Sequence, residues 1–213
     1  MHYKTSQYEK FANPAACAVL LKRTFCAFAF GMLFVLTAVP FQSAQAASNA
    51  KTAKSPEWIY PVIPGFGGVH PRSDVAVRPD PKENYKIFVD VISNERDPAG
   101  KFNALNRLAR LVNLMGYAKV PHNHVHIVAL LDEKVGYASG TNAFYRKTFG
   151  GDNPNLPLIH ALKKAGVELL VCSQGLAGNN IPDSAIDPDV TITLSALTDM
   201  VVYGQKGYVY MRL

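Results

Sequence analysis

Residues 155–175 read NLPLIHALKKAGVELLVCSQG, and this stretch decides the fold because it contains one complete helix–strand unit. Asn155 is a favourable helix N-cap, Pro157 suits the first helical turn, and two lysines occupy the last turn. Gly166 ends the predicted helix, and the apolar run 167–172 follows as a strand that ends at a cysteine. A short apolar strand reached directly from a helix is typical of a parallel sheet.

The same alternation of strands and helices extends along the chain on both sides of this unit. Further strands are predicted at 85–92, 124–131, 190–194 and 207–212, and further helices at 103–115, 143–149 and 195–204. Gly116 is expected to stop the first helix, and Ser195 to cap the last. The pattern predicts an α/β fold, an open, mostly parallel five-stranded sheet with helices on both faces. Ligands of such sheets bind beyond the C-terminal ends of the strands.

The N-terminal segment has the three parts of a secretory signal peptide. The basic pair Lys22-Arg23 precedes an apolar run at 25–39, and Ala44-Gln45-Ala46 offers small residues for cleavage after Ala46. The apolar run has about 15 residues, fewer than the roughly 20 that span a bilayer. We therefore expect removal of residues 1–46, which leaves a periplasmic or secreted protein without a membrane anchor.

Removal of this leader changes the charge and the cysteine content of the chain. The leader carries four basic residues and one acidic residue, so the formal charge falls from +6 to +3. This charge is not the basic stripe of a nucleic-acid-binding domain, and nucleic acid is not an expected partner. Two of the three cysteines also lie in the leader, so Cys172 is the single thiol of the predicted mature chain. No internal disulfide is then possible.

Residues 47–84 differ from the α/β domain predicted at 85–213. Six prolines and three glycines between positions 56 and 81 interrupt any helical or strand period. The segment is nevertheless apolar around Trp58 and Ile63. We expect an extended arm that packs on the domain or on a neighbouring subunit.

Cys172 is the main candidate for chemistry, because it ends a strand at the edge where such sheets bind ligands. If the next residues begin a short helix, its free N–H groups would favour the thiolate, the nucleophilic form of the side chain. The alternative is a buried, inert cysteine, since free cysteines are among the most buried residues. Asp90, Asp97 and Asp132 are candidate general acids or bases, with ordinary polar loop residues as the alternative.

Three alternating histidines, His122, His124 and His126, would point to one side of a strand and so suggest a metal site. They stand at the start of the second predicted strand, opposite the predicted cleft, and no Cys, Asp or Glu lies beside them. Solvated histidines are therefore expected, and no metal site is assigned. His160 has an inner spacing on its helix and is expected to pack against the core.

Several segments together resemble the DsrE family, in particular an exported branch of it. The matching segments are 85–90, 152–156, 165–174, 189–191 and 195–197, with 58–63 and 67–69 in the arm. The resemblance covers roughly residues 56 to 213. It implies a DsrE-like fold, homo-oligomers that are commonly trimers or hexamers, and chemistry that needs no cofactor.

In sulfur-relay members of that family, a cysteine at this strand end carries sulfur as a persulfide, and Cys172 matches its position. The resemblance implies that Cys172 passes sulfur from a donor to a thiol-bearing protein partner, with Ser173, Gln174 and Asp90 as candidate binding residues. The chain departs from the family pattern in having Ser173 in place of a glycine. It also has Asp132-Glu133 after the second strand in place of a His-Gly pair.

These observations favour an exported sulfur carrier over an enzyme with turnover. The alternative function is a non-catalytic oligomeric binding module in which Cys172 is buried. A third and weaker hypothesis is a metal-binding protein that uses His122, His124 and His126.

Overall fold

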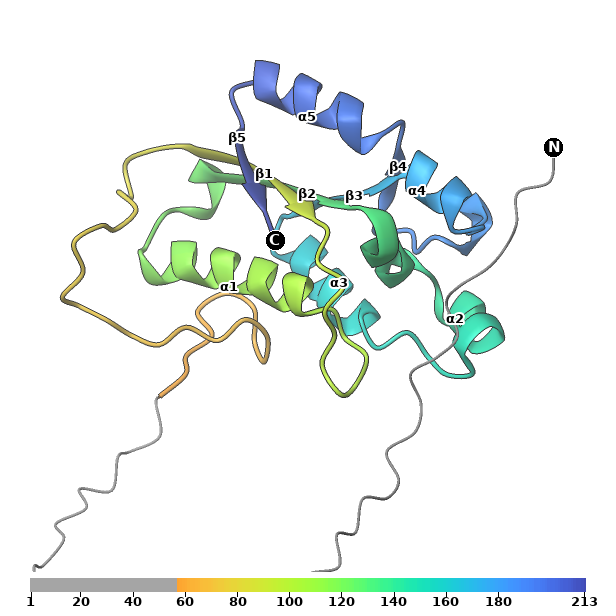
Figure 1. Ribbon diagram of the computed structural model, residues 1–213. Helices are drawn as coiled ribbons and strands as arrows, with labels where there is room; N and C mark the ends of the chain where they lie inside the picture. Colours follow the sequence, from red (N-terminus) through yellow and green to blue (C-terminus); the bar gives the residue numbers. More distant parts are fainter. Residues whose placement is uncertain (1–56) are drawn as a thin grey trace, which may run out of the picture. The chain divides into compact units, whose positions relative to one another are not determined.

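The computed structural model describes residues 57–213, which form one sheet with helices on both faces (Figure 1). The strands are β1 (Tyr85–Val91), β2 (Val125–Leu131), β3 (Glu168–Cys172), β4 (Thr191–Thr193) and β5 (Val209–Arg212). The helices are α1 (Asn103–Tyr117), α2 (Asn142–Phe149), α3 (Leu156–Lys164), α4 (Ser173–Gly178) and α5 (Ala196–Gln205), and the short 3₁₀ turns are η1 (His122–His124), η2 (Glu133–Ser139) and η3 (Asp183–Ala185). The predicted signal peptide lies outside the described residues. Within 57–213, no helix combines the length and apolar character needed to cross a membrane.

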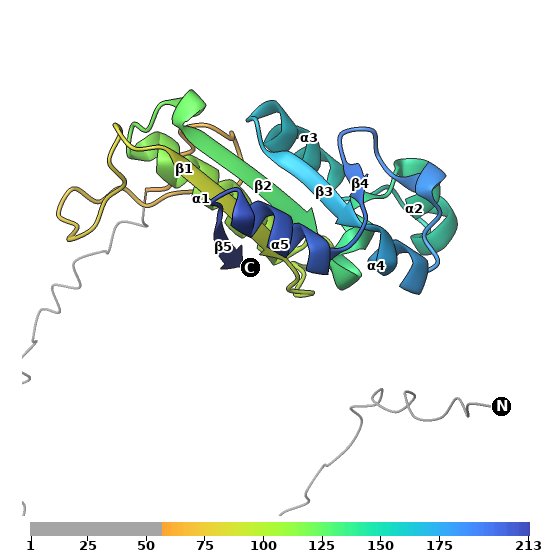
Figure 2. The same ribbon diagram turned by 90° about the horizontal axis from the view of Figure 1, so that it is seen from above.

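The five strands lie in the order β4-β3-β2-β1-β5, and all four strand pairs are parallel. The predicted α/β fold is thereby confirmed, with a wholly parallel sheet where a mostly parallel one was expected. Successive strands step in one direction from β1 to β4, and the chain then returns past three strands to place β5 beside β1 (Figure 2). Because crossovers are right-handed, this return puts α5 on the face opposite α1 and α3.

The larger core lies between the sheet and the helices α1 and α3. Val89, Ala129 and Leu169, from three neighbouring strands, point to this face. They pack with Leu108 of α1 and Ile159 of α3, and all five side chains are fully buried. The residues of β1 and β2 are buried in unbroken runs because both faces of the sheet are covered.

The second face has a smaller core and a single long helix. Phe88, Leu170 and Cys172 alternate with the residues of the first face and pack under Ala196 and Met200 of α5. Leu170 pairs with Leu130, which pairs with Asp90, so Asp90 also belongs to this face. On this face, the candidate cysteine lies at the C-terminal end of its strand, where the start of α5 covers it.

The arm packs on α1 of the same chain. Ile63 and Val69 are buried, and an antiparallel bridge joins Ile59 to Val69. The side-chain oxygen of Asn113 accepts hydrogen bonds from the backbone N–H groups of Val62 (2.9 Å) and Ile63 (2.8 Å). Its amide nitrogen donates to the carbonyls of residues 66 and 67. Asn113 is therefore the polar anchor of the arm.

Two glycines permit this close packing. A Cβ on Gly67 would lie 2.2 Å from the backbone nitrogen of Arg110, and one on Gly116 would lie 2.3 Å from a methyl group of Val62. Gly116 was expected to stop the helix, but it lies inside α1, which continues to Tyr117. Gly116 makes room for the arm, and helix stop signals in a sequence do not reveal such a role.

Asn155 occupies the predicted N-cap position of α3, but its side chain caps nothing in that helix. The side-chain oxygen of Asn155 accepts instead from the backbone N–H of Phe102 (3.0 Å), and its amide group contacts the side chain of Asn153 (3.1 Å). The Asn-Pro-Asn segment thus ties the start of α1 to the start of α3. Ser195, in contrast, caps α5 as predicted, by accepting from the N–H of Leu197 (3.2 Å).

Candidate functional site

A cleft of about 660 Å³ opens beyond the C-terminal ends of the strands, on the α5 side. Its lining comes from the ends of β1, β3 and β5, the turn after β2, helix α4 and the first residues of α5. The lining residues are Asp90, Ile92, Asp132, Glu133, Lys134, Cys172, Gln174, Gly175, Gly178, Asn179, Ser195, Ala196, Leu197, Met200, Tyr210 and Arg212. This is the edge at which the sequence predicted a site, since parallel strands direct their carboxyl ends to one side.

Cys172 lies at the floor of this cleft, with 4% of its surface exposed. The backbone N–H of Ala196, the first residue of α5, points at its Sγ across 3.4 Å. The sulfur therefore accepts a hydrogen bond from the first residue of a ten-residue helix. The short helix α4 does begin directly after Cys172, as the sequence suggested. The N–H that reaches the sulfur, however, comes from α5.

The two polar residues that follow Cys172 differ in their relation to the cleft. Gln174 lines it, whereas Ser173 is absent from its lining. The Ser173 hydroxyl donates to the carbonyl of Leu194 at 2.7 Å, and the amide of Gln174 reaches the same carbonyl at 3.3 Å. Ser173 therefore ties α4 to the turn before α5, and its role as a ligand-binding residue stays a prediction.

Asp90 is a buried acid in the wall of the cleft, with 2% of its surface exposed. Its Oδ2 accepts a hydrogen bond from the Tyr210 hydroxyl at 2.8 Å, while Oδ1 has no partner among the described residues. Burial raises the pKa of Asp90, and the nearby Asp132 carboxylate adds to this shift against the opposing effects of Tyr210 and Arg212. Burial and the bond to Asp90 likewise raise the pKa of Tyr210.

The rim of the cleft carries charges of both signs. Asp132 caps η2 by accepting from the N–H of Glu133 at 2.8 Å, and Lys134 donates to the side-chain oxygen of Asn179 at 2.7 Å. Asn179, the C-cap residue of α4, also donates to the carbonyl of Glu133 at 3.4 Å, and these two contacts hold α4 against η2. The cleft thus combines a thiol, a buried acid, and flanking cationic and anionic groups, which suits a small polar reactant.

Several other sequence candidates lie outside the cleft. Asp97 accepts hydrogen bonds from the backbone N–H groups of Ala99 and Lys101 in a tight turn, and the hydrogen bond from Lys101 is the main cause of its lowered pKa. The three alternating histidines were expected to share one face of a strand. Instead, His122 and His124 belong to the turn η1, and His126 lies on β2. His122 contacts the carbonyl of residue 165 and His124 that of residue 81.

His160 is exposed on α3, which corrects the expectation that it packs in the core. The buried face of α3 includes Ile159 and Leu162, and His160 is rotated from Ile159 by about 100° around the helix. Its Nε2 lies 3.2 Å from each carboxylate oxygen of Asp187, in the segment before β4.

The sequence analysis missed Tyr210, Arg212 and Ala196 as parts of the site. Tyr210 and Arg212 reach the cleft because β5 pairs with β1, and Ala196 because α5 starts above β3. The Ser195 cap was a signal for the start of α5. No sequence pattern indicated that β5 would pair with β1, since that pairing joins residues more than 100 positions apart.

Comparisons with known proteins relate the chain to one family and to solved structures. A family model described as DsrE/DsrF-like matches residues 86–213. Similar solved structures include a protein of unknown function, MTH1491, from Methanobacterium thermoautotrophicum, at 15% identity and a TM-score of 0.43, covering 61% of this chain and 100% of that one. The ychN protein from E. coli is similar at 17% identity and a TM-score of 0.40, covering 60% of this chain and 99% of that one. No curated protein matches the chain.

Proposed function

This chain belongs to the DsrE/DsrF-like family, and we propose that it is an exported sulfur carrier that holds sulfur as a persulfide on Cys172. The observation that carries the proposal is the 3.4 Å contact between the Ala196 N–H and the Cys172 sulfur at the floor of the cleft. A thiol at a helix N-terminus is a favourable nucleophile, and the cleft opens this thiol toward a second reactant.

The transfer follows the course of thiol–disulfide exchange. The Cys172 thiolate attacks the terminal sulfur of a donor persulfide, a sulfur–sulfur bond forms on Cys172, and the donor leaves as a thiolate. An acceptor thiolate then attacks the terminal sulfur of the Cys172 persulfide, and Cys172 returns to the thiolate. One neutral sulfur atom moves in each step, so neither step needs an outside oxidant or reductant. A thiol-bearing protein is the partner that this chemistry requires.

Two cationic groups of the cleft support this chemistry. Lys134 and Arg212 line the same cleft as Cys172 and favour an anionic terminal sulfur or an anionic donor. Gln174, which also lines the cleft, offers an amide donor to the same sulfur. Lys134 and Arg212 thus extend the candidate binding set, which already includes Gln174 and Asp90.

A specific observation favours a second function, that of a non-catalytic binding module. Cys172 is almost fully buried and packs with Leu170 and Ala196 in the smaller core. In this function the cysteine is a core residue, and the cleft binds a small molecule or a protein segment without reacting with it.

We further propose that the protein acts as a homo-oligomer, a trimer or hexamer, in the periplasm or outside the cell. The proposal of export rests on the leader at 1–46. The proposal of an oligomer rests on the outer side of α5 and the adjoining strand, where large apolar side chains are exposed. They are Leu194, Leu197, Val201, Val202 and Val209. An apolar surface of this kind is typical of a protein–protein interface.

The decisive experiment measures the mass of the intact protein after incubation with polysulfide or thiosulfate. The carrier function predicts a gain of one or more sulfur masses that is absent from the Cys172→Ser variant. Alkylation of the native and of the denatured protein reports the accessibility of the thiol. A thiol that alkylates only after denaturation and never gains sulfur would contradict the carrier function and support the binding module.

A further inference from the structure

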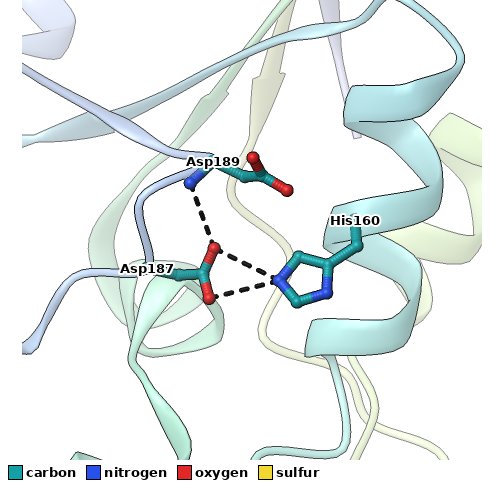
Figure 3. Close-up of side chains that lie close together, drawn as sticks. All are labelled: His160, Asp187 and Asp189. Carbon is teal, nitrogen blue, oxygen red and sulfur yellow. Dashed lines mark hydrogen bonds and ion pairs between the residues drawn. The ribbon is translucent and has the colours of Figure 1, made fainter.

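A histidine and two aspartates lie together away from the Cys172 cleft (Figure 3). His160 comes from α3, and Asp187 and Asp189 come from the segment that precedes β4. The three residues lie outside the lining of the cleft. An imidazole nitrogen and two carboxylate oxygens are all established ligands of divalent transition metals.

The distances between these ligand atoms suit a single small ion. The Nε2 atom of His160 lies 3.2 Å from both carboxylate oxygens of Asp187, and one atom of each of the three residues lies within 4.8 Å of the others. Two ligands of a tetrahedral zinc ion with bonds of about 2.0–2.2 Å are separated by about 3.3–3.6 Å. At 3.2 Å, His160 and Asp187 are slightly closer than that spacing, and rotation of the half-buried Asp189 side chain brings in the third ligand.

The position of the central ligand is fixed by its surroundings. Asp187 is buried, and its backbone N–H donates to the carbonyl of Ser139 at 2.7 Å. One of its carboxylate oxygens accepts from the backbone N–H of Asp189 at 3.1 Å. Hydrogen bonds of this kind orient a metal ligand before the ion arrives. On the other side, the fully buried Ile159 fixes the turn of α3 that carries His160.

From this geometry we propose that His160, Asp187 and Asp189 together bind a zinc ion. A neutral imidazole and two carboxylates carry two negative charges, which a divalent ion neutralises. The imidazole favours zinc over magnesium or calcium, which take oxygen ligands. Three protein ligands leave one position for water, and the exposure of His160 gives solvent access to it.

The bound ion would join α3 to the segment that leads into β4. That segment continues through β4 to Ser195 and Ala196, whose N–H reaches the Cys172 sulfur. Zinc binding therefore stabilises the part of the chain that places the start of α5. The site shares no residue with the cleft, so zinc binding can be tested apart from the sulfur chemistry.

The test is zinc titration of the full chain, expressed and purified without a histidine tag and freed of metal by a chelator. A background in which Cys17, Cys26 and Cys172 are all replaced by serine removes the thiols as competing ligands. We expect one zinc ion per chain by calorimetry and a higher unfolding temperature with zinc. Cobalt should give the visible absorption bands of a tetrahedral site.

Two variants and one control locate the site. Asp189→Ala and His160→Ala should each weaken zinc binding by at least tenfold and abolish the cobalt bands. The Asp189 side chain makes no hydrogen bond within 57–213, so its loss should leave folding intact, which the unfolding temperature without metal verifies. His126→Ala removes an exposed histidine elsewhere on the surface and should leave binding unchanged.

Three results would overturn the proposal. The first is the absence of zinc binding in the parent protein. The second is an equal affinity in Asp189→Ala, which would leave His160 and Asp187 as a simple ion pair. The third is a loss of binding in His126→Ala, which would place the zinc on the histidines near η1.

Discussion

The Tyr210 hydroxyl donates to the Asp90 carboxylate at 2.8 Å, and this bond joins two residues that are 120 positions apart in the chain. Tyr210 stands on β5, which pairs with β1 in parallel, and its ring lies 6.4 Å from that of Phe88. The tyrosine thus covers a buried acid that has no other partner for one of its oxygens in the described chain. This contact affects the pKa of Asp90 and helps to hold β5 against β1.

Asp90→Asn should stabilise the protein at neutral pH. Burial raises the pKa of Asp90 above its ordinary value of 3.8, so the folded state binds the proton more tightly than the unfolded state does. Stability is therefore greatest below the unfolded pKa and falls as pH rises through the folded pKa. Asparagine resembles the protonated acid and escapes this loss. The gain at pH 7 should exceed the ~0.5 kcal/mol typical of surface substitutions.

Thermal unfolding of both proteins between pH 3 and pH 8 measures this difference. The curves should converge at the acid end and separate as pH rises. Asp183→Asn, which changes an exposed aspartate outside the lining of the cleft, is the matched control and should track the parent protein. A constant offset between Asp90→Asn and the parent at all pH values would show that packing, not the charge, makes the difference.

Tyr210→Phe should destabilise the fold by about 1–3 kcal/mol, the usual cost of leaving a buried polar group without its partner. The variant removes the only hydrogen bond to the Asp90 side chain within residues 57–213. Urea denaturation measures the effect. Tyr208→Phe removes a hydroxyl without a hydrogen bond to the described chain and should cost much less.

The double variant tests whether the two residues act through each other. If Tyr210 stabilises the fold by its bond to the buried acid, its replacement should cost less when Asp90 is already asparagine. Strictly additive free energies of unfolding would mean that Tyr210 acts by ring packing alone.

Asn113→Ala should release the arm from α1. The Asn113 side chain makes four hydrogen bonds to the arm backbone, and its loss leaves the buried N–H of Ile63 and the part-buried N–H of Val62 without partners. We expect a loss of about 2–4 kcal/mol in the free energy of unfolding. Proteolysis should also cut the arm faster in the folded protein. Leu114→Ala, at the next and exposed position of α1, is the control and should change neither readout.

Local patterns sufficed to predict much of the sheet and part of the site. Cys172 could be placed at the C-terminal edge of the sheet because a short apolar run ended there. Asp90 could be placed at the same edge because its strand is parallel to that of Cys172. The contact from Ala196 and the cover from Tyr210 could not be predicted, because both depend on the return of the chain to β1. Helical spacing also misplaced His160, since one residue of offset rotates a side chain out of the core.

Leu197→Glu should reduce the size of the assembly. Leu197 is 76% exposed in the single chain, and Val201 on the same helix and Val209 on the edge strand are exposed as well. If this apolar surface joins subunits, a buried and unpaired glutamate would cost several kcal/mol at each contact. Light scattering after size-exclusion chromatography should then report a monomer. Val77→Glu places the same charge at an exposed position of the arm and should leave the assembly intact. An unchanged mass for Leu197→Glu would mean that α5 is free for a different protein, and the thiol-bearing acceptor of Cys172 would then be the partner to test on this face.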